Sequence, residues 1–213
     1  MLELVDSLDL KSSGIYSRGG SSPPEATTII NNMNILSSNK VDMIDNLLKL
    51  DEFKVIEICK IISKILKKNT VFCIGNGGSA SISNHFVCDL VKGFNYKKKF
   101  SMISLSSNIE MITAISNDIS YEDIFSFQIS KYAKKGDLLF AISSSGKSKN
   151  IINAIKEAKK KSIKTISLTG FDGGVAMKLS DYNINIDSKN YGVIEDMHSF
   201  IMHAICQHLH KEV

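Results

Sequence analysis

Apolar residues recur along this chain in two spacings, one helical and one typical of buried strands. Two stretches with apolar side chains at every third or fourth position predict amphipathic helices at 33–50 and 52–67. Short continuous apolar runs predict strands at 70–74, 101–105, 137–142, 164–168 and 183–186. The intervening and final stretches predict helices near 79–93, 107–116, 122–134, 148–161, 174–180 and 194–211.

The alternation of strand and helix predicts the fold class. Strands that are apolar throughout are buried on both faces, which is typical of a parallel sheet covered by helices on each side. We therefore expect an α/β protein whose first two helices pack on the sheet. In such folds ligands bind beyond the carboxyl ends of the strands.

The first 28 residues differ in composition from the rest. They hold both prolines and the only arginine, whereas Lys, Ile, Asn and Ser dominate from Ile29 onward. This change predicts that 1–28 is a leader, either an added linker or a natural disordered tail, and that 29–213 is a single domain.

Composition narrows the class of protein. A chain of 213 residues with 43% hydrophobic and 23% charged residues is typical of one globular domain. It has neither a signal-peptide pattern nor an apolar run long enough to span a bilayer, so we expect no membrane association. The four cysteines follow no metal or disulfide spacing, which favours a reducing, cytoplasmic location.

The net charge of +4 does not change the expected class of protein. Most lysines stand singly along helices, and no aromatic-rich basic face accompanies them, so nucleic-acid binding is not favoured. A mildly positive field suits an anionic small substrate.

Three polar loops follow predicted strands. Gly75-Asn76-Gly77-Gly78-Ser79 opens a helix whose free N–H groups could bind an anion, although a simple connecting turn explains it equally well. Ser143-Ser144-Ser145-Gly146-Lys147-Ser148 also opens a helix, and its hydroxyls favour phosphate binding over a plain helix cap. A third loop, 169–174, repeats the pattern of strand, glycine loop and helix, although a simple tight turn explains it equally well.

Two predicted helices carry possible acid–base groups. His85 and Asp89 are four residues apart and share one helix face. The last helix carries Glu195, Asp196 and four of the five histidines, of which His208 and His210 are typical of a solvated polar helix.

The chain resembles the phosphoheptose isomerases, enzymes of the sugar-isomerase (SIS) domain class, over roughly residues 33–213. The resemblance rests on the two glycine- and serine-rich loops together with His85-Phe86, Ser116-Asn117-Asp118, Leu168-Thr169-Gly170 and Glu195-Asp196-Met197-His198. It implies a flavodoxin-like three-layer sandwich, a homotetramer with active sites at subunit interfaces, and an aldose–ketose isomerase. The implied reaction converts sedoheptulose 7-phosphate to D-glycero-D-manno-heptose 7-phosphate for surface polysaccharides.

The resemblance also implies roles for particular residues. The implied substrate contacts are Asn76, Gly77, Gly78, Ser79, Asn117, Asp118, Ser143, Ser144, Ser145, Ser148 and Glu195. One zinc ion per active site would be bound by His85, Asp89, Glu195 and His203. For an enediol reaction, which needs a base and an acid, we expect Asp89 and His203 to be catalytic.

The chain departs from the family at two of these positions. Asp89 stands where the family has Glu, and Glu195 stands where it has Gln. A side chain shorter by about 1.5 Å matters, because a misplacement of about 1 Å can cost on the order of 10²-fold in rate. An isomerase for another ketose phosphate, or a non-catalytic SIS protein that binds a sugar phosphate and regulates, therefore remains an alternative.

Overall fold

A computed structural model describes the backbone of residues 24–93 and 100–212. Its helices are α2 (Pro24–Lys49), α3 (Glu52–Leu66), α4 (Gly78–Gly93), α5 (Ile109–Asp118), the 3-10 turn η1 (Tyr121–Asp123), α6 (Ile124–Tyr132), α7 (Lys149–Lys160), α8 (Gly174–Leu179) and α9 (Tyr191–Glu212). Its strands are β1 (Thr70–Ile74), β2 (Ser101–Ser104), β3 (Leu138–Ser143), β4 (Lys164–Gly170) and β5 (Tyr182–Ile186). The predicted order of strands and helices is confirmed.

Two of the helices differ most from the prediction. The helix expected over 122–134 is a 3-10 turn followed by α6, and the first helix begins at Pro24 rather than near residue 33. Proline is well suited to the first position of a helix, where its missing N–H has no partner to lose. The interpretation of 1–28 as a leader falls largely on 1–23, which lie outside the described residues, and it stays a prediction.

The five strands form one parallel sheet in the order β2-β1-β3-β4-β5. β1 lies between β2 and β3, with Val71 opposite both Met102 and Leu138. From β1 the chain moves to β2 on one side, and then crosses to β3 on the other side. The order of the strands therefore reverses between β1 and β3. Ligands of open α/β sheets bind at such a reversal, beyond the carboxyl ends of the two strands.

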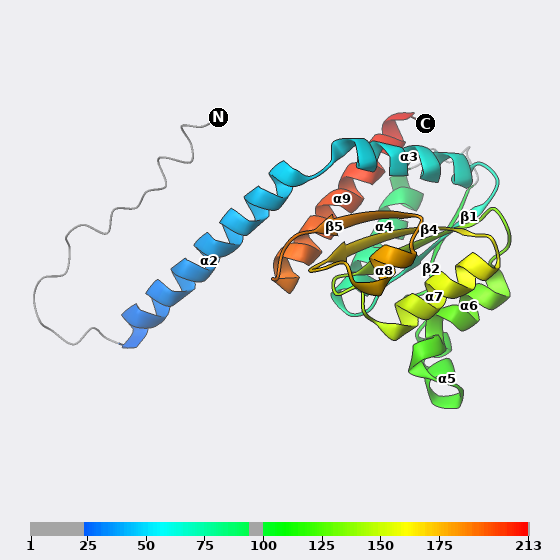
Figure 1. Cartoon of the computed structure of the whole chain (residues 1–213), viewed down its shortest axis with the longest axis horizontal. Helices are drawn as coiled ribbons and strands as arrows, with labels where there is room; N and C mark the ends of the chain where they lie inside the picture. The colour runs from blue at the N-terminus through cyan, green and yellow to red at the C-terminus, as the bar shows by residue number, and fades with distance from the viewer. Residues whose placement is uncertain (1–23, 94–99, 213) are drawn as a thin grey trace, which may run out of the picture. The chain divides into compact units, whose positions relative to one another are not determined.

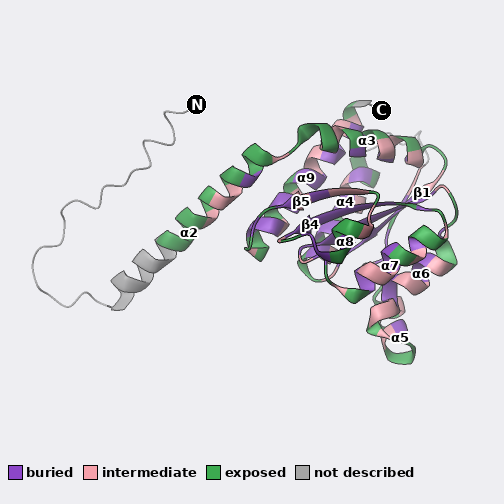
Figure 2. Cartoon of the chain, viewed as in Figure 1, coloured by how far each residue is buried: buried purple, intermediate pink, exposed green. Residues whose placement is uncertain are grey.

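Helices cover both faces of the sheet, as Figure 1 shows, and the strands between them are buried (Figure 2). One core joins α3, α4 and α9 to the sheet and includes Ile62, Phe86 and Ile201. A second core joins α5, α6, α7 and α8 to the opposite face and includes Phe125 and Ile155. The three-layer, flavodoxin-like α/β sandwich is thus confirmed.

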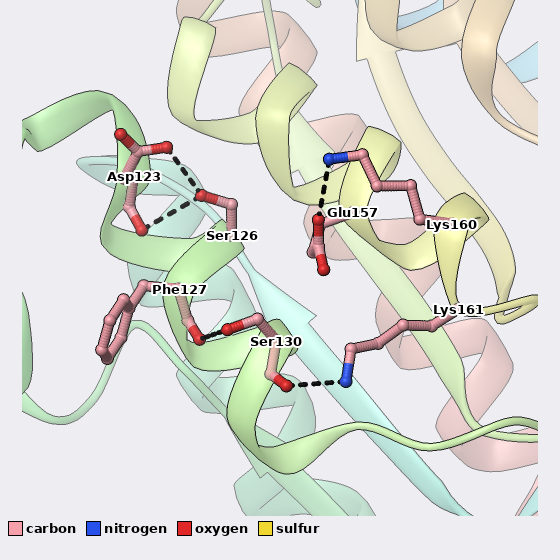
Figure 3. Close-up of polar contacts among 7 residues, drawn as sticks. All are labelled: Asp123, Ser126, Phe127, Ser130, Glu157, Lys160 and Lys161. Atoms are coloured by element: carbon pink, nitrogen blue, oxygen red, sulfur yellow. Dashed lines mark hydrogen bonds and ion pairs between the residues drawn. The ribbon is translucent and has the colours of Figure 1, made fainter.

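Polar contacts tie α6 to α7 on the second face (Figure 3). Lys161, just after α7, donates to the carbonyl oxygens of Ser130 at 2.6 Å and Ala133 at 3.0 Å. A cation there satisfies carbonyls at the negative end of α6. At the other end of α6, the hydroxyl of Ser126 donates to the Asp123 carboxylate at 2.9 Å. These contacts hold η1, α6 and α7 together beside the sheet.

The chain divides into two compact units between Ser38 and Asn39. The unit from Asn39 onward contains the whole sheet and every predicted site residue. Of the helices within the described residues, none is both long enough and apolar enough to cross a membrane.

Candidate functional site

Two of the predicted loops meet at the reversal between β1 and β3. Gly75–Ser79 follows β1 and Ser143–Ser148 follows β3, and these strands are neighbours in the sheet. The side chains of Asn76 and Asn150 join the loops directly through two hydrogen bonds of 2.9 and 3.0 Å. The pairing of these loops across the sheet is what a ligand site at the strand ends requires.

The glycine loop after β1 is shaped by close approaches. A Cβ atom on Gly75 would collide with the backbone of Ser79, and Gly77 has a positive φ of 52° that side-chain-bearing residues rarely adopt. Ser106, after β2, fixes the loop from the other side. Its hydroxyl accepts from the Gly75 N–H at 3.0 Å and donates to the Gly75 carbonyl at 2.9 Å.

The serine loop has hydroxyls without protein partners. Ser143 and Ser144 are buried, and the Ser144 hydroxyl has no hydrogen-bond partner among the described residues. Ser148 is the N-cap residue of α7, and its side chain makes no cap hydrogen bond. Unpaired hydroxyls at the start of a helix are suited to binding an anionic oxygen.

The backbone of the serine loop is anchored on the next loop of the sheet. The Gly146 carbonyl accepts from the Ala176 N–H at 2.9 Å, and the Ser144 carbonyl accepts from the Gly170 N–H at 2.8 Å. Gly146 has a φ of 60°, and a Cβ atom there would collide with the Gly173 carbonyl. The loop can therefore present its hydroxyls from a fixed backbone.

His85, Asp89 and His203 form a cluster on the facing sides of α4 and α9. The Asp89 carboxylate contacts His85 Nε2 at 3.2 Å through one oxygen and His203 Nε2 at 3.6 Å through the other. The two imidazole rings stand edge to face with centroids 5.1 Å apart. The side chains of His85, Asp89 and His203 are 53%, 31% and 44% exposed, so a ligand or a partner subunit can reach the cluster.

The donor atoms of this cluster could hold a metal ion. One ligand atom from each of the three residues lies within 4.8 Å of the others. Two imidazoles and a carboxylate are a zinc donor set with a coordination position left for substrate. Cys206 is also near, but burial, together with the Asp89 charge, raises the pKa of its thiol to about 12, so it stays protonated at neutral pH.

Glu195 does not join this cluster within one chain. Its carboxylate packs against Gly78 at the start of α4, where a Cβ atom would collide with it. At the far end of the same helix pair, the His210 ring packs against Gly93. The helices therefore run in parallel, and His85 lies about 10 Å further along α4 than Gly78, at about 1.5 Å per residue.

Asn117 and Asp118 lie at the exposed end of α5. Their side chains hydrogen-bond to each other at 2.8 Å, and the described contacts do not join them to the other predicted substrate residues. His198 in α9 is fully buried, and its Nε2 lies 3.0 Å from the Thr169 carbonyl. Burial lowers the pKa of His198 to about 4.

Sequence reasoning missed three residues that contact the glycine loop. Ser106 and Asn150 support it as described, and the Tyr121 hydroxyl donates to Asn76 Oδ1 at 3.2 Å. None of them carries a motif. A signal was present only for Asn150, which follows the serine loop by two residues.

Comparisons with known proteins agree with this arrangement. The SIS domain family model matches residues 40–170. A probable phosphoheptose isomerase of Thermoplasma acidophilum is 42% identical over 161 residues, which is 75% of this chain and 88% of that protein. Two solved phosphoheptose isomerase structures superpose closely. The one from Neisseria gonorrhoeae has a TM-score of 0.79 at 25% identity, covering 87% of this chain and 100% of that one. The one from Francisella tularensis has a TM-score of 0.80 at 26% identity, covering 86% and 98%.

Proposed function

The chain belongs to the phosphoheptose isomerases, a family of SIS-domain enzymes, and from that membership we propose that it interconverts sedoheptulose 7-phosphate and D-glycero-D-manno-heptose 7-phosphate. The observation that carries the proposal is the Asp89 carboxylate, which contacts two imidazoles at an accessible position. Aldose–ketose isomerisation needs such a group to move a proton between adjacent carbons.

The serine loop would hold the phosphate. Ser143, Ser144, Ser145 and Ser148 offer hydroxyl donors, and the start of α7 offers backbone N–H groups. The unpartnered Ser144 hydroxyl supports this role, because a buried polar group without a partner costs about 1–3 kcal/mol and gains a partner when phosphate binds. Asn76, Gly77, Gly78 and Ser79 would contact the sugar from the glycine loop, and Glu195 would contact it from the start of α9.

Asp89 and His203 would carry the proton transfers. A base removes the proton from C1 of the ketose while an acid protonates the C2 oxygen, which gives an enediol. Loss of the O1 proton and protonation of C2 then give the aldose. We assign the carbon proton to Asp89 and the oxygen protons to His203. Their separation of 3.6 Å supports this division, because both groups could then reach adjacent atoms of one substrate.

His85, Asp89 and His203 would hold a divalent metal ion, and zinc suits their donor atoms. When bound, such an ion polarises a substrate carbonyl and stabilises negative charge on oxygen. Glu195 of the same chain lies too far along α9 to complete this set, since eight residues correspond to about 12 Å of helix. Glu195 from a second subunit could complete it.

We therefore propose a homotetramer in which neighbouring subunits share each active site. Exposed apolar side chains support assembly, because Val41, Ile44, Leu48 and Phe53 are each at least half exposed. The separation of the cluster from the loops along α4 supports sharing, since the cluster of one subunit could face the loops of another. Asn117 and Asp118 would likewise contact substrate held by a neighbour.

The setting of the reaction is a further part of the proposal. The four cysteines are free thiols, which supports a reducing cytoplasmic compartment. The product would feed the synthesis of surface polysaccharides.

The decisive experiment offers sedoheptulose 7-phosphate and a panel of other ketose phosphates to the purified protein and follows aldose formation. We expect turnover of the heptose phosphate, and a loss of about 10²–10⁴-fold in Asp89→Asn. Turnover of a different ketose phosphate alone would assign the enzyme to that substrate. Binding without turnover of any would indicate a regulatory SIS protein.

A further inference from the structure

Asn150 is a buried amide at the start of α7, and its side chain joins the backbone of that helix to Asn76 in the glycine loop. It is 2% exposed. Its Oδ1 accepts from the backbone N–H of Ile151 at 2.9 Å and from Asn76 Nδ2 at 2.9 Å. Its Nδ2 donates to Asn76 Oδ1 at 3.0 Å. Helix α7, which begins at the serine loop, therefore holds the Asn76 side chain of the glycine loop through Asn150.

These contacts determine which way each amide faces. A backbone N–H can only donate, so the atom of Asn150 that meets the Ile151 N–H must be its oxygen. The side-chain nitrogen of Asn150 then donates to Asn76, so the accepting atom of Asn76 must be its side-chain oxygen. The amide of Asn76 is thus oriented by the backbone of α7 through Asn150.

Tyr121 completes the arrangement. Its hydroxyl lies 3.2 Å from Asn76 Oδ1 and has to act as the donor, because that atom is an acceptor only. η1, which carries Tyr121, is held to α7 by the Lys149–Glu122 ion pair at 2.7 Å and by Asn153 Nδ2 on the Glu122 carbonyl at 3.1 Å. Both acceptor positions of the Asn76 oxygen are then occupied, and one N–H of its amide has no partner within the described part of the chain.

We infer that Asn150 and Tyr121 are positioning residues that make Asn76 a fixed hydrogen-bond donor to an acceptor oxygen of the sugar phosphate. The inference rests on the proposed function for the identity of that ligand. Asn150 touches no substrate and acts only through Asn76. A ligand with a donor group at that point would meet a second donor and be rejected, so the pair also contributes to specificity.

A double-mutant cycle tests this. The proteins are wild type, Asn76→Ala, Asn150→Ala and the double variant, and the measurements are kcat/KM and the Kd for sedoheptulose 7-phosphate. Because Asn150 acts through Asn76, we expect Asn150→Ala to lower kcat/KM by about 10-fold or more in the wild-type background and by less than about 2-fold in the Asn76→Ala background. Equal losses in both backgrounds would show a merely structural role and overturn the inference.

Gln128 provides a matched control. It is also a buried amide, 2% exposed, and donates to the carbonyls of Leu105 and Ile124 but not to Asn76. Gln128→Ala should lower the melting temperature comparably but change kcat/KM by the same small factor in both backgrounds. If Gln128→Ala shows the same coupling to Asn76 as Asn150→Ala, the coupling is not specific and the inference is wrong.

Two further measurements keep the test decisive if Asn150→Ala folds poorly or if the wild type turns over no heptose phosphate. Tyr121 is exposed, so Tyr121→Phe should fold normally and weaken sugar-phosphate binding by about 2–5-fold, the effect of one neutral hydrogen bond. Crystal structures of Asn150→Ala and Tyr121→Phe should show the Asn76 side chain displaced. An Asn76 that keeps its position in both variants overturns the inference whatever the activity, whereas a displaced Asn76 in a protein without turnover contradicts only the proposed function.

Discussion

Asp89 is the single residue on which the proposed chemistry depends most, because both imidazoles of the cluster contact its carboxylate. Replacement of Asp89 by Asn keeps the shape of the side chain but removes its ability to accept a proton. We expect kcat to fall by about 10²–10⁴-fold, the usual contribution of an acid–base group. The melting temperature should change little, since the side chain is partly exposed and its ion pairs contribute little stability.

Asp89→Glu is the matched comparison, because it restores the longer carboxylate of the family. Faster turnover of sedoheptulose 7-phosphate would show that the shorter side chain is a handicap for that substrate. Loss of turnover would show that the site is adjusted to Asp. Wild-type activity in Asp89→Asn would contradict a catalytic role for this residue.

Ser144 allows stability and binding to be separated. Its buried hydroxyl has no partner among the described residues, so Ser144→Ala removes an unsatisfied polar group. We expect the free energy of unfolding to stay the same or rise by about 1 kcal/mol, while the KM for the sugar phosphate increases several-fold. Denaturant unfolding and steady-state kinetics on the same preparation measure both. A loss of stability with unchanged KM would mean that the hydroxyl serves the fold and not the phosphate.

At the scale of elements, the contact between His198 Nε2 and the Thr169 carbonyl joins α9 to the end of β4. The His198 pKa of about 4 in the folded protein lies below the ordinary value of 6.5, because burial disfavours the charged imidazole. Around and below pH 6.5, His198 binds a proton in the unfolded chain but stays neutral in the folded protein until the pH approaches 4. The free energy of unfolding should therefore fall by about 3 kcal/mol as the pH drops from about 7.5 to 4, and this group should cause little change above about pH 7.5.

The measurement compares the pH dependence of unfolding for the wild type and His198→Gln. The variant should lose most of this slope, even if its stability at neutral pH is lower. Identical slopes between pH 4 and 6.5 would show that other groups cause the acid sensitivity.

Most strands and helices, and part of the candidate site, could be predicted from the sequence. Strand and helix ends were close to their predicted places because glycine and serine clusters separate strongly apolar strands, as at 75–79 after β1. The pairing of His85 with Asp89 followed from helical spacing alone. The family resemblance, not spacing, added His203 to the pair.

The site contacts that the sequence did not predict depend on which strands are neighbours in the sheet. A single sequence does not contain that information directly. Asn150 and Tyr121 matter only because β1 pairs with β3, which brings Asn76 beside α7 and η1. Nothing local in the sequence marks Tyr121, and the only local signal for Asn150 is its position two residues after the serine loop. The position of Glu195 against Gly78 likewise follows from the packing of α4 on α9.

At the scale of the whole molecule, the proposed sharing of active sites can be tested by mixing inactive variants. Glu195 and His203 are separated along α9, so each active site would take them from different subunits. Co-refolding of Glu195→Ala with His203→Ala at equal amounts should then restore about one quarter of wild-type activity, since random assembly places both intact residues at about that fraction of interfaces.

A second pair serves as the control. Asp89 and His203 belong to the cluster of one chain, so mixing Asp89→Asn with His203→Ala should restore nothing. If neither mixture regains activity although mixed oligomers form, each site draws its residues from a single chain.

The neighbour relation of β1 and β3 also has a kinetic consequence. Val71 pairs with Leu138 across a long stretch of chain that contains β2, so this contact closes a large loop, and such non-local contacts slow folding. A sugar phosphate bound across the two loops would link the same two strands and stabilise only the closed sheet. Substrate should therefore prolong the lifetime of the folded protein against proteolysis far more than it changes the rate at which the chain first folds.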